Sequence, residues 1–498
     1  LENDLTPLDG PVEIVGPGKD QMKIDGGAEN YNSLLETQSD LKVSGITLAN
    51  GWTDGKGGAI SATLSDVVVE NSRLEGNRAG SAGGGISVAA GSLTLRDSEV
   101  TGNFSAGDGA GVYVYYQSAA DISDSTLSGN KSVTGAGGAS LGPSSYGKSK
   151  INDSVFEGNT GALGGGLYAK GGIDVDSTLF SGNTAERAGG AVTGSLVNSI
   201  FAPSDSSVTN STFTGNKAEV GGALLAVRGT KIQSSTIVGN TSTNSSGPAF
   251  AEGAGILAMN GEVKLDNTIV SANTPTDIRA TPAATDPFPA SAGSIAGSFN
   301  LIGTAPGVSV TDTVPGSNIS STNPVLGALA DNGGPTETML PTESSPVVNK
   351  GSSPLKVDQR GLTRPVDFNS IPFSTADGAN GADIGAVELQ GGPLPPVPPS
   401  NAFTFGKVKL NKKKGVATLQ VKVPGKGKVL LLGSKDVKSQ NKSAKKKSTV
   451  TLTVKAKGKA AKQLKKKGKA KVKAKVKFTP TGGKAKTKSK TVKLVRPT

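Results

Sequence analysis

The stretch VFEGNTGALGGGLY, residues 155–168, contains the two signals that decide the fold, an Asn-Thr pair and a triple glycine between short apolar segments. Taken alone, the stretch resembles a loop. It is instead one copy of a repeat, because glycine-led tetrapeptides such as GGAI, GGGI and GAGV begin at residues 57, 83, 109, 137, 164, 189, 221 and 253. Self-similarity at a period of a few dozen residues is typical of solenoid proteins.

A second series runs between the glycine tetrapeptides, with strings such as NSRLEGN, DSEVTGN and NSTFTGN. Its copies lie mostly 24 to 29 residues apart, with two intervals of 33 residues. They end at asparagines, namely Asn77, Asn103, Asn130, Asn159, Asn183, Asn216, Asn240 and Asn273.

Within each copy, apolar and polar residues alternate, as in SLTLRDSEV at 92–100 and GVYVYY at 111–116. A period of two predicts strands with one buried face, and no copy shows a sustained helical period. A unit of this length with two or three short strands is one rung of a parallel β-helix. We therefore predict an all-β chain, a right-handed parallel β-helix of about ten rungs and roughly 50 Å in length.

The recurrent asparagines and glycines have a structural role in this interpretation. Side chains that recur in register stack into columns, and an asparagine column can form hydrogen bonds from neighbour to neighbour. Glycine supplies positive φ and lets adjacent rungs approach closely. The alternative, a phosphate-binding glycine loop, needs a following helix that the sequence does not contain.

Charge divides the chain into two bodies. Residues 401–498 hold 32 of the 53 Lys and Arg residues but a single acid, Asp436, which leaves about −18 on residues 1–400 and +31 on the remainder. Such asymmetry indicates different partners for the two parts. We expect repeats at 1–273, the end of the β-helix and a capping region at 274–390, a proline-rich linker at 391–401 and a lysine-rich β-sandwich at 402–498.

The glycine and Asn series resembles the repeats of right-handed β-helix surface proteins of the pectin-lyase-like superfamily, including polymorphic outer-membrane-protein repeats. The motifs NPVLGALADNGGPTETMLP at 323–341, DQRGLTRP at 358–365 and ADIGAVE at 382–388 resemble the choice-of-anchor Q region of secreted bacterial β-helices. The cysteines that such regions often carry are absent. This resemblance implies a bacterial surface or secreted protein and supplies no activity.

Polysaccharide lyases and glycoside hydrolases of the same superfamily provide the alternative function. The chain has no histidine and no cysteine, which excludes imidazole or thiolate metal sites, a cysteine nucleophile and a Ser-His-Asp triad. Asp97, Asp124 and Asp153 share one repeat position and could bind a cation as a column. Asn71, Asn210 and Ser234 occupy the same position, which favours a structural turn. We predict no catalytic residue, no metal and no cofactor.

Tyrosines after the glycine series are candidates for ligand contact. Tyr113, Tyr115 and Tyr168 lie on strands and should point away from the buried valines, with Tyr113 and Tyr168 in one register and Leu141 on the rung between them. In a chain with 4% aromatic residues, an outward tyrosine strip could stack against a sugar. The alternative is that the rings only cover the rod beneath a loop.

Charged residues in the anchor-Q-like region could be mistaken for a site. Because opposed charges near a chain end commonly pair, we expect an ion-pair clamp that closes the last rung and covers its unpaired strand edges. Its residues would be Asp358, Arg360, Arg364, Asp383 and Glu388.

Beyond the linker, six or seven alternating segments and a short helix at 460–468 predict a small antiparallel Ig-like β-sandwich. It resembles the lysine-rich C-terminal modules of some actinobacterial secreted proteins. In KAKVKAKVKF, every second residue is a lysine of one face: Lys469, Lys471, Lys473, Lys475 and Lys477. That face is either a solvated strand surface with edge protection or a contact surface for a polyanion.

These observations favour a non-enzymatic, adhesin-like protein that binds a polysaccharide or another cell-envelope polyanion. Specific nucleic-acid binding is disfavoured, because the basic region has three aromatic residues and one arginine. No apolar run approaches the length of a membrane helix. The chain opens on Leu1 and shows no signal peptide, so we expect a processed or trimmed extracellular form.

Overall fold

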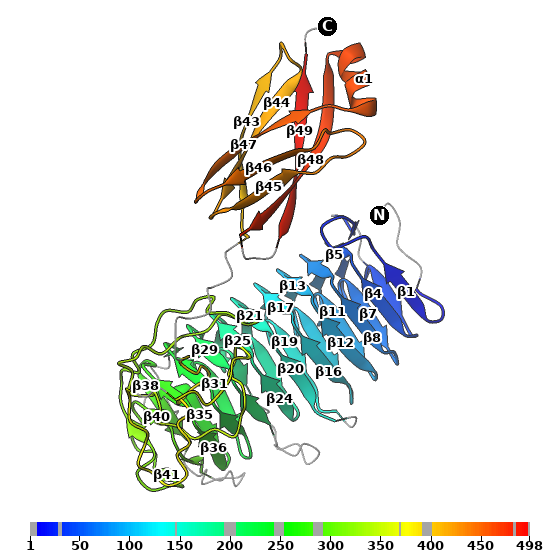
Figure 1. Ribbon diagram of the computed structural model, residues 1–498. Helices are drawn as coiled ribbons and strands as arrows, with labels where there is room; N and C mark the ends of the chain where they lie inside the picture. The colour runs from blue at the N-terminus through cyan, green and yellow to red at the C-terminus, as the bar shows by residue number, and fades with distance from the viewer. Residues whose placement is uncertain are drawn as a thin grey trace. The chain divides into compact units, whose positions relative to one another are not determined.

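The computed structural model describes residues 7–27, 32–144, 147–193, 206–243, 253–281, 292–367, 370–390, 401–481 and 485–496. The chain divides into two compact units, Leu1–Gly392 and Pro393–Thr498 (Figure 1). Residues 391–400 of the expected linker lie outside the described residues.

The first unit is a right-handed parallel β-helix, here called the rod, as predicted. Its described residues form four parallel sheets. In chain order within a rung, sheet A contains β3(Leu35–Thr37), β7(Ile60–Thr63), β11(Ile86–Ala89), β15(Val112–Tyr115), β19(Ala139–Leu141), β23(Leu167–Ala169), β27(Val192–Thr193), β31(Leu224–Val227), β35(Gly253–Met259) and β38(Thr276–Ala280). Sheet B contains β1(Val12–Val15), β4(Leu41–Ser44), β8(Val67–Glu70), β12(Ser92–Arg96), β16(Ala119–Ser123), β20(Ser149–Asn152), β24(Ile173–Asp176), β28(Ser207–Thr209), β32(Lys231–Gln233), β36(Glu262–Asp266), β39(Ser294–Gly297) and β41(Val310–Asp312).

Two further sheets complete each rung. Sheet C contains β2(Lys23–Asp25), β5(Thr47–Ala49), β9(Arg73–Glu75), β13(Glu99–Thr101), β17(Thr126–Ser128), β21(Val155–Glu157), β25(Leu179–Ser181), β29(Thr212–Thr214), β33(Thr236–Val238), β37(Ile269–Ser271), β40(Leu301–Ile302) and β42(Ile319–Ser320). Sheet D contains β6(Trp52–Thr53), β10(Arg78–Ala79), β14(Phe104–Ser105), β18(Lys131–Ser132), β22(Thr160–Leu163), β26(Thr184–Ala188), β30(Lys217–Ala218) and β34(Thr241–Ser242). Where sheet D is present, the expected two or three strands per rung are four, because two-residue strands such as β10 are too short to show an alternation.

The rod's core is a set of apolar columns along its axis. One column stacks three phenylalanine rings, with centroids 4.8 Å apart between Phe156 and Phe180 and 4.9 Å apart between Phe180 and Phe213.

The glycine tetrapeptides lie where adjacent rungs approach too closely for a side chain. Gly83 has a φ of +66°, and a Cβ on Gly84 would lie 2.3 Å from the carbonyl oxygen of Phe104. A side chain at Gly84 would force the rungs apart, whereas one at Gly83 would be strained by the left-handed φ and would clash with Ile86 of the same turn.

The eight asparagines lie in a buried column between sheets C and D. The Nδ2 group of each donates to Oδ1 of the next at 2.8–2.9 Å, and the same Oδ1 accepts the backbone N–H of the preceding asparagine. The column ends on Asp277, whose Oδ1 accepts both N–H groups of Asn273 at 2.8 Å. Such a column keeps buried amides saturated along the rod.

Residues 323–367 and 370–390 lie along the outer face of sheet C. Thr212 Oγ1 donates to Gln359 Oε1 at 2.6 Å, the amide of Ala386 donates to Thr236 Oγ1 at 3.0 Å, and Asn267 Nδ2 donates to the carbonyl of Asp383 at 2.9 Å. The segment covers outward apolar residues of sheet C, and it stabilises several rungs at once.

The second unit is a small antiparallel β-sandwich, here called the basic sandwich. One sheet contains β43(Thr404–Asn411), β44(Val416–Val423) and β47(Ser448–Lys455), and the other contains β46(Gln440–Ala444), β45(Gly427–Leu431), β48(Lys469–Pro480) and β49(Lys486–Val495). The expected short helix is α1(Gly458–Lys467), which ends at the left-handed Gly468. The sheets enclose an apolar core that includes Phe403, Leu419 and Phe478.

Candidate functional site

The three tyrosines of sheet A lie in one cluster. The rings of Tyr113 and Tyr115 are stacked, with centroids 4.6 Å apart and planes 18° from parallel. Both rings are half-buried, whereas Tyr168 is 8% exposed. The residue between Tyr113 and Tyr168 is Ser140 and not Leu141, which faces the core. The expected register was wrong because this copy reads AGGA from residue 136, and a slip of one residue exchanges the two faces of a strand.

Two lysines, Lys170 and Lys56, lie beside these rings. Lys170 Nζ lies 5.0 Å from the ring centroid of Tyr168 and 5.7 Å from that of Tyr113, and it donates to Asp108 Oδ2 at 2.5 Å. Lys56 Nζ lies 4.6 Å from the ring centroid of Tyr115. These cation–π contacts place positive charge beside the tyrosine rings.

Asp108 organises this cluster. Its Oδ1 accepts the backbone N–H groups of Gly109 and Ala136 at 2.9 Å, and its Oδ2 accepts the Ser140 hydroxyl at 2.8 Å as well as Lys170. Burial raises the pKa of Tyr113 and Tyr168, so both phenols stay protonated at neutral pH. The arrangement offers two partly exposed rings flanked by lysines, and Lys56 Nζ donates to the Tyr115 hydroxyl at 3.1 Å.

The aspartates of the turn between sheets B and C behave as turn residues. Asp97, Asp124 and Asp153 have φ of 50°, 49° and 50°, and Asn71 and Ser234 at equivalent positions have 45° and 48°. Short polar side chains tolerate this left-handed conformation. Burial and the neighbouring aspartates raise the pKa of Asp153. Across the described ranges, no group of three or more Asp or Glu residues is arranged to hold a metal ion.

The five charged residues of the anchor-Q-like region form a buried cluster. Arg364 Nε donates to Glu388 Oε2 at 3.0 Å, and Arg360 donates to Asp358 Oδ2 from Nε at 3.0 Å and from Nη2 at 2.7 Å. The side chains of both pairs are 0% exposed. The expected clamp is thus present, although it lies against the flank of the rod.

Asp383 is the carboxyl group of this cluster that has no arginine of its own. Its oxygens accept the backbone N–H groups of Asn349 at 2.7 Å and Leu389 at 2.6 Å. Burial, followed by the negative charge of Glu388, raises the pKa of Asp383 to about 7. Two arginines therefore face three carboxyl groups in the cluster, and the third gains its proton near neutral pH.

The lysines of β48 lie on one face, as the alternation predicts. Burial alternates along the strand, with lysines outward and Ala470, Val472, Ala474, Val476 and Phe478 in the core. On the neighbouring strand β49, Lys493 lies directly opposite Lys471. We call the set Lys469, Lys471, Lys473, Lys475, Lys477 and Lys493 the lysine face.

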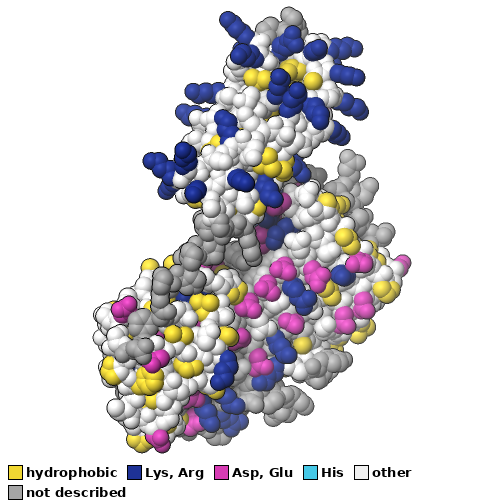
Figure 2. All heavy atoms as spheres, in the orientation of Figure 1, with side chains coloured by type: hydrophobic (Ala, Val, Ile, Leu, Met, Phe, Trp, Pro, Cys, Tyr) yellow, Lys and Arg dark blue, Asp and Glu magenta, His cyan; other side chains and the backbone are white. Residues whose placement is uncertain are grey.

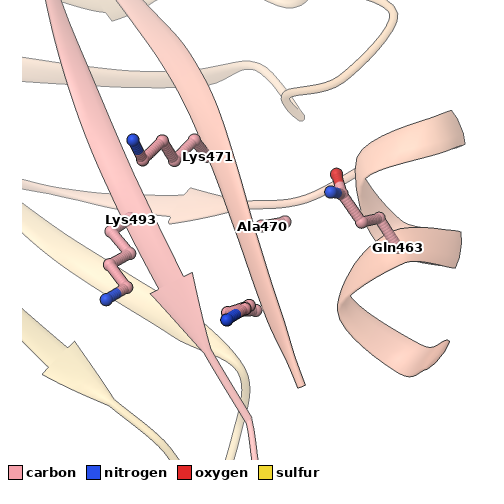
Figure 3. A pocket seen from close by; sticks show the side chains of 5 residues that line it. Gln463, Ala470, Lys471 and Lys493 are labelled. Atoms are coloured by element: carbon pink, nitrogen blue, oxygen red, sulfur yellow. The ribbon is translucent and has the colours of Figure 1, made fainter. Parts of the chain in front are cut away.

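One end of the lysine face is hollowed. A pocket of about 250 Å³ is lined by Gln463, Lys469, Ala470, Lys471 and Lys493 (Figure 3). Gln463 projects from α1 towards β48, while Lys471 and Lys493 extend from adjacent strands. The pocket therefore combines ammonium groups with an amide that can donate or accept a hydrogen bond.

The surfaces of the two units differ in charge. In Figure 2, Lys and Arg cover the visible face of the basic sandwich, whereas acidic and basic side chains are mixed on the rod. Asp436 is the single acidic side chain after residue 400. The lysine face thus cannot be neutralised by acidic side chains of its own unit, and like charges such as Lys471 and Lys493 repel at a cost in stability.

Sequence reasoning missed several members of these clusters. Lys493 could have been found, because TVKLV at 491–495 alternates as β48 does. Gln463, Lys56 and Lys170 could not, since their positions depend on how a helix packs and on side chains that reach across rungs.

The family model described as the right-handed beta helix region matches residues 28–185. Comparison with curated proteins gives no match. In the part of the chain that the structure describes, no helix is long and apolar enough to cross a membrane. The match and the four parallel sheets agree on the fold of the rod.

Proposed function

We propose that the protein is an extracellular or cell-surface bacterial β-helix protein whose basic sandwich binds an anionic polymer of the cell envelope. One observation carries the proposal, namely that the lysine face presents six lysines in a unit whose single acidic side chain is Asp436. A polyanion would relieve their mutual repulsion and release its own counterions. Wall teichoic acids and acidic polysaccharides have the required charge.

The proposal also includes a family assignment for each of three regions of the chain. The motifs at 323–341, 358–365 and 382–388 support a choice-of-anchor Q region, and the glycine and Asn series supports repeats of the polymorphic outer-membrane-protein type. The composition of residues 402–498 supports a lysine-rich module of the actinobacterial kind. All three are resemblances to secreted proteins, and together they favour a role in adhesion or in the structure of the envelope.

A retention experiment with the full chain tests the lysine face. Purified protein is incubated with bacterial wall fractions at low and high salt, and bound protein is measured. Lys469, Lys471, Lys473, Lys475 and Lys477 are replaced together by Gln. A matched variant carries the same replacement at five exposed lysines on other parts of the unit: Lys412, Lys413, Lys414, Lys445 and Lys446.

We expect the lysine-face variant to lose most low-salt retention and the matched variant to keep most of it, because adjacent charges on one face act together. Wild-type retention should fall steeply with salt. Equal losses in the two variants would contradict the lysine face as the contact surface. Salt-insensitive retention would contradict binding through charge.

The tyrosine cluster is the proposed contribution of the rod to glycan binding. Tyr113 and Tyr115 keep part of their rings exposed, and Lys56 and Lys170 add positive charge beside them. Replacing Tyr113, Tyr115 and Tyr168 by Ala in the same assay should weaken polysaccharide retention at high salt, where stacking remains and charge attraction is screened. Unchanged retention rejects this surface.

A further inference from the structure

Strand β49 places a row of hydroxyl groups beside the lysine face. Antiparallel pairing sets the last three lysines of β48 each opposite a hydroxyl residue, in the pairs Lys473 with Thr491, Lys475 with Ser489 and Lys477 with Thr487. The three hydroxyl residues are exposed, and we call them the hydroxyl row: Thr487, Ser489 and Thr491. Residues directly opposite on antiparallel strands have Cβ atoms about 5 Å apart on the same face, so one ligand group can contact both side chains.

The two sheets of the basic sandwich differ in their outer faces. In one sheet, the inner strand β48 carries five lysines on alternate outward residues. In the other sheet, the inner strand β44 carries one lysine among its outward residues, which are Val416, Thr418, Gln420 and Lys422. The lysine row is therefore a feature of one sheet face and does not follow from the lysine-rich composition alone.

The single acidic side chain of this unit already has another partner. Asp436 Oδ1 accepts the backbone N–H of Ala460 at 3.3 Å, in the first turn of α1. A negative charge at this end of a helix is stabilising. None of the ion pairs that the described residues form includes a residue of the basic sandwich. The negative charge that neutralises the lysine face therefore comes from outside the unit.

The spacing of the lysines indicates which anionic polymer fits. They recur at every second residue of β48, and in an extended strand this distance is about 6.7 Å. Two residues contain six main-chain bonds, so an extended polymer with charges six backbone bonds apart has a similar spacing. In 1,3-linked poly(glycerol phosphate), two P–O, two O–C and two C–C bonds separate successive phosphorus atoms. Its phosphates therefore match the interval of the lysines.

A phosphodiester also suits the pairing of ammonium and hydroxyl groups. Its single negative charge is shared by two terminal oxygens, so one oxygen can accept from a lysine and the other from the opposite hydroxyl. Lysine binds phosphate as a point charge, and Ser and Thr hydroxyls are common phosphate donors. By contrast, the carboxylates of an extended β-1,4-linked uronic acid chain alternate sides. Those that face one surface recur at every second sugar, which is a longer interval than that of the lysines.

The pocket at one end of the lysine face has room for a phosphate group. Here Lys493 takes the place of a hydroxyl residue opposite Lys471, and Lys469 and Gln463 complete the charged and polar lining (Figure 3). The amide of Gln463 can donate a hydrogen bond to a phosphate oxygen. The pocket thus continues the row of cations with a third ammonium group and an amide donor.

We propose that the lysine face and the hydroxyl row bind a linear polyol phosphate of the poly(glycerol phosphate) type, with one phosphodiester between each lysine and the hydroxyl group opposite. This inference rests on the proposed function of the lysine face and specifies the chemistry of its polymer. Nucleic acids have the same interval between phosphates, but their bases stack on exposed aromatic rings. The three phenylalanines of this unit lie in or against its apolar core.

Calorimetric titration of the full chain at low salt tests the interval and the chemistry separately. Four oligomers with equal numbers of negative charges are compared. The 1,3-linked glycerol phosphate is the expected ligand, and 1,5-linked ribitol phosphate has the same charged groups eight bonds apart. A β-1,4-linked glucuronate replaces phosphate by carboxylate, and a thymidylate keeps the interval but adds bases.

Two triple variants test the hydroxyl row. One combines Thr487→Val, Ser489→Ala and Thr491→Val. The matched variant combines Thr449→Val, Thr451→Val and Thr453→Val at outward positions of β47, on the other sheet. The fivefold Lys→Gln variant of β48 is titrated with the same four oligomers.

We expect glycerol phosphate to bind about tenfold more tightly than ribitol phosphate or glucuronate. A different interval carries the charges out of step with the lysines along the row, so fewer contacts form at once. The hydroxyl-row variant should bind glycerol phosphate about tenfold more weakly, because the hydrogen bonds to the phosphodiesters are lost. The matched variant should bind as the wild type does.

Four results would overturn the inference. They are equal affinities for glycerol and ribitol phosphates, equal affinities for glycerol phosphate and glucuronate, a thymidylate that binds as tightly as glycerol phosphate, and a hydroxyl-row variant that binds glycerol phosphate as the wild type does. Failure of the proposed function has a different signature, since the fivefold variant would then bind all four oligomers as the wild type does. If only the narrower inference fails, the fivefold variant loses affinity for every oligomer that the wild type binds.

Discussion

The rod and the basic sandwich both enclose an apolar core, but they handle polar groups in opposite ways. The rod places amides and ion pairs inside, where each is saturated by the next copy or by the segment 323–390. The sandwich has an apolar core, and its lysines lie outside without acidic partners of their own. Interactions within the rod thus serve its own stability, whereas the charges of the sandwich are available to partners.

This difference also separates structural residues from functional ones. In the rod, the most regular residues of the sequence are buried, and Asn77, Asn130, Asn159, Asn183 and Asn216 are 0% exposed. In the sandwich, the most regular residues are the exposed lysines of β48. Evenly spaced residues of one type therefore indicate side chains that line up on neighbouring strands. Burial then decides whether those side chains have a structural role or are available to a partner.

The largest effect is expected from interruption of the asparagine column. Asn159 Oδ1 accepts from the backbone N–H and the Nδ2 group of Asn130, and its Nδ2 donates to Asn183 Oδ1 and to the carbonyl of Leu127. Asn159→Ala leaves several of these groups buried without partners, so we expect a loss of about 3–5 kcal/mol in the unfolding free energy of the rod. Urea unfolding followed by Trp52 emission measures it.

The matched control is Thr160→Ala, which changes the next residue on the same rung, a half-buried outward side chain. We expect less than about 1 kcal/mol there. The unfolding transition of the basic sandwich should be unaffected by either variant. A loss below about 1 kcal/mol for Asn159→Ala would show that the column contributes little to the stability of the rod.

The sequence was sufficient for the fold of both units, because each depends on periodicity. Alternation in segments such as SLTLRDSEV at 92–100 predicted strands, the spacing of the asparagines predicted stacked copies, and the lysine alternation in 469–478 predicted an outward face. The two-residue strands were not predicted because they are too short to show an alternation. Strand β46 was not predicted because QNKSA at 440–444 has no alternating apolar residues. The register at Ser140 was missed because Ala136 replaces the first glycine of the copy, so that the glycine pair suggested a start one residue too late.

The candidate sites were less predictable, since they depend on contacts between distant residues. The clamp residues were identified, but their place on the flank of sheet C follows from pairs more than a hundred residues apart, such as Thr212 with Gln359. Lys56 and Lys170 were missed because their side chains reach the tyrosine rings from other rungs. A fixed register makes such contacts visible only once the strands are placed.

An intermediate effect on stability is expected from Asp383, the carboxyl group of the rod's buried charged cluster that has no arginine of its own. It is buried beside Glu388 and Arg364, and its pKa is raised from 3.8 to about 7, mainly by burial. The folded state therefore keeps a proton that the unfolded state releases between these values. Stability supplied by this group falls as pH rises through that window and is constant above it.

Asp383→Asn removes this titration. The difference in rod melting temperature between the variant and wild type should shift in favour of the variant as pH rises from about 5 to about 8. Comparing the two pH values cancels any fixed cost of the amide. A difference that is constant across the window would show that Asp383 has the same protonation state in the folded and unfolded chains.

The smallest effect concerns the basic sandwich, where like charges meet on adjacent strands. Lys471 faces Lys493, whereas Lys473 faces Thr491 on the next outward position. Lys493→Thr copies the neighbouring pair, so we expect it to raise the unfolding free energy of the sandwich by up to about 1 kcal/mol at low salt. Added salt screens the same repulsion and should raise wild-type stability more than that of the variant.

The rod, whose buried ion pairs are shielded from the solvent, should show a weaker salt dependence in the same calorimetric scans. If Lys493→Thr leaves both the stability and its salt dependence unchanged, the lysines of the two strands do not repel measurably, and a polyanion would gain nothing from relieving them.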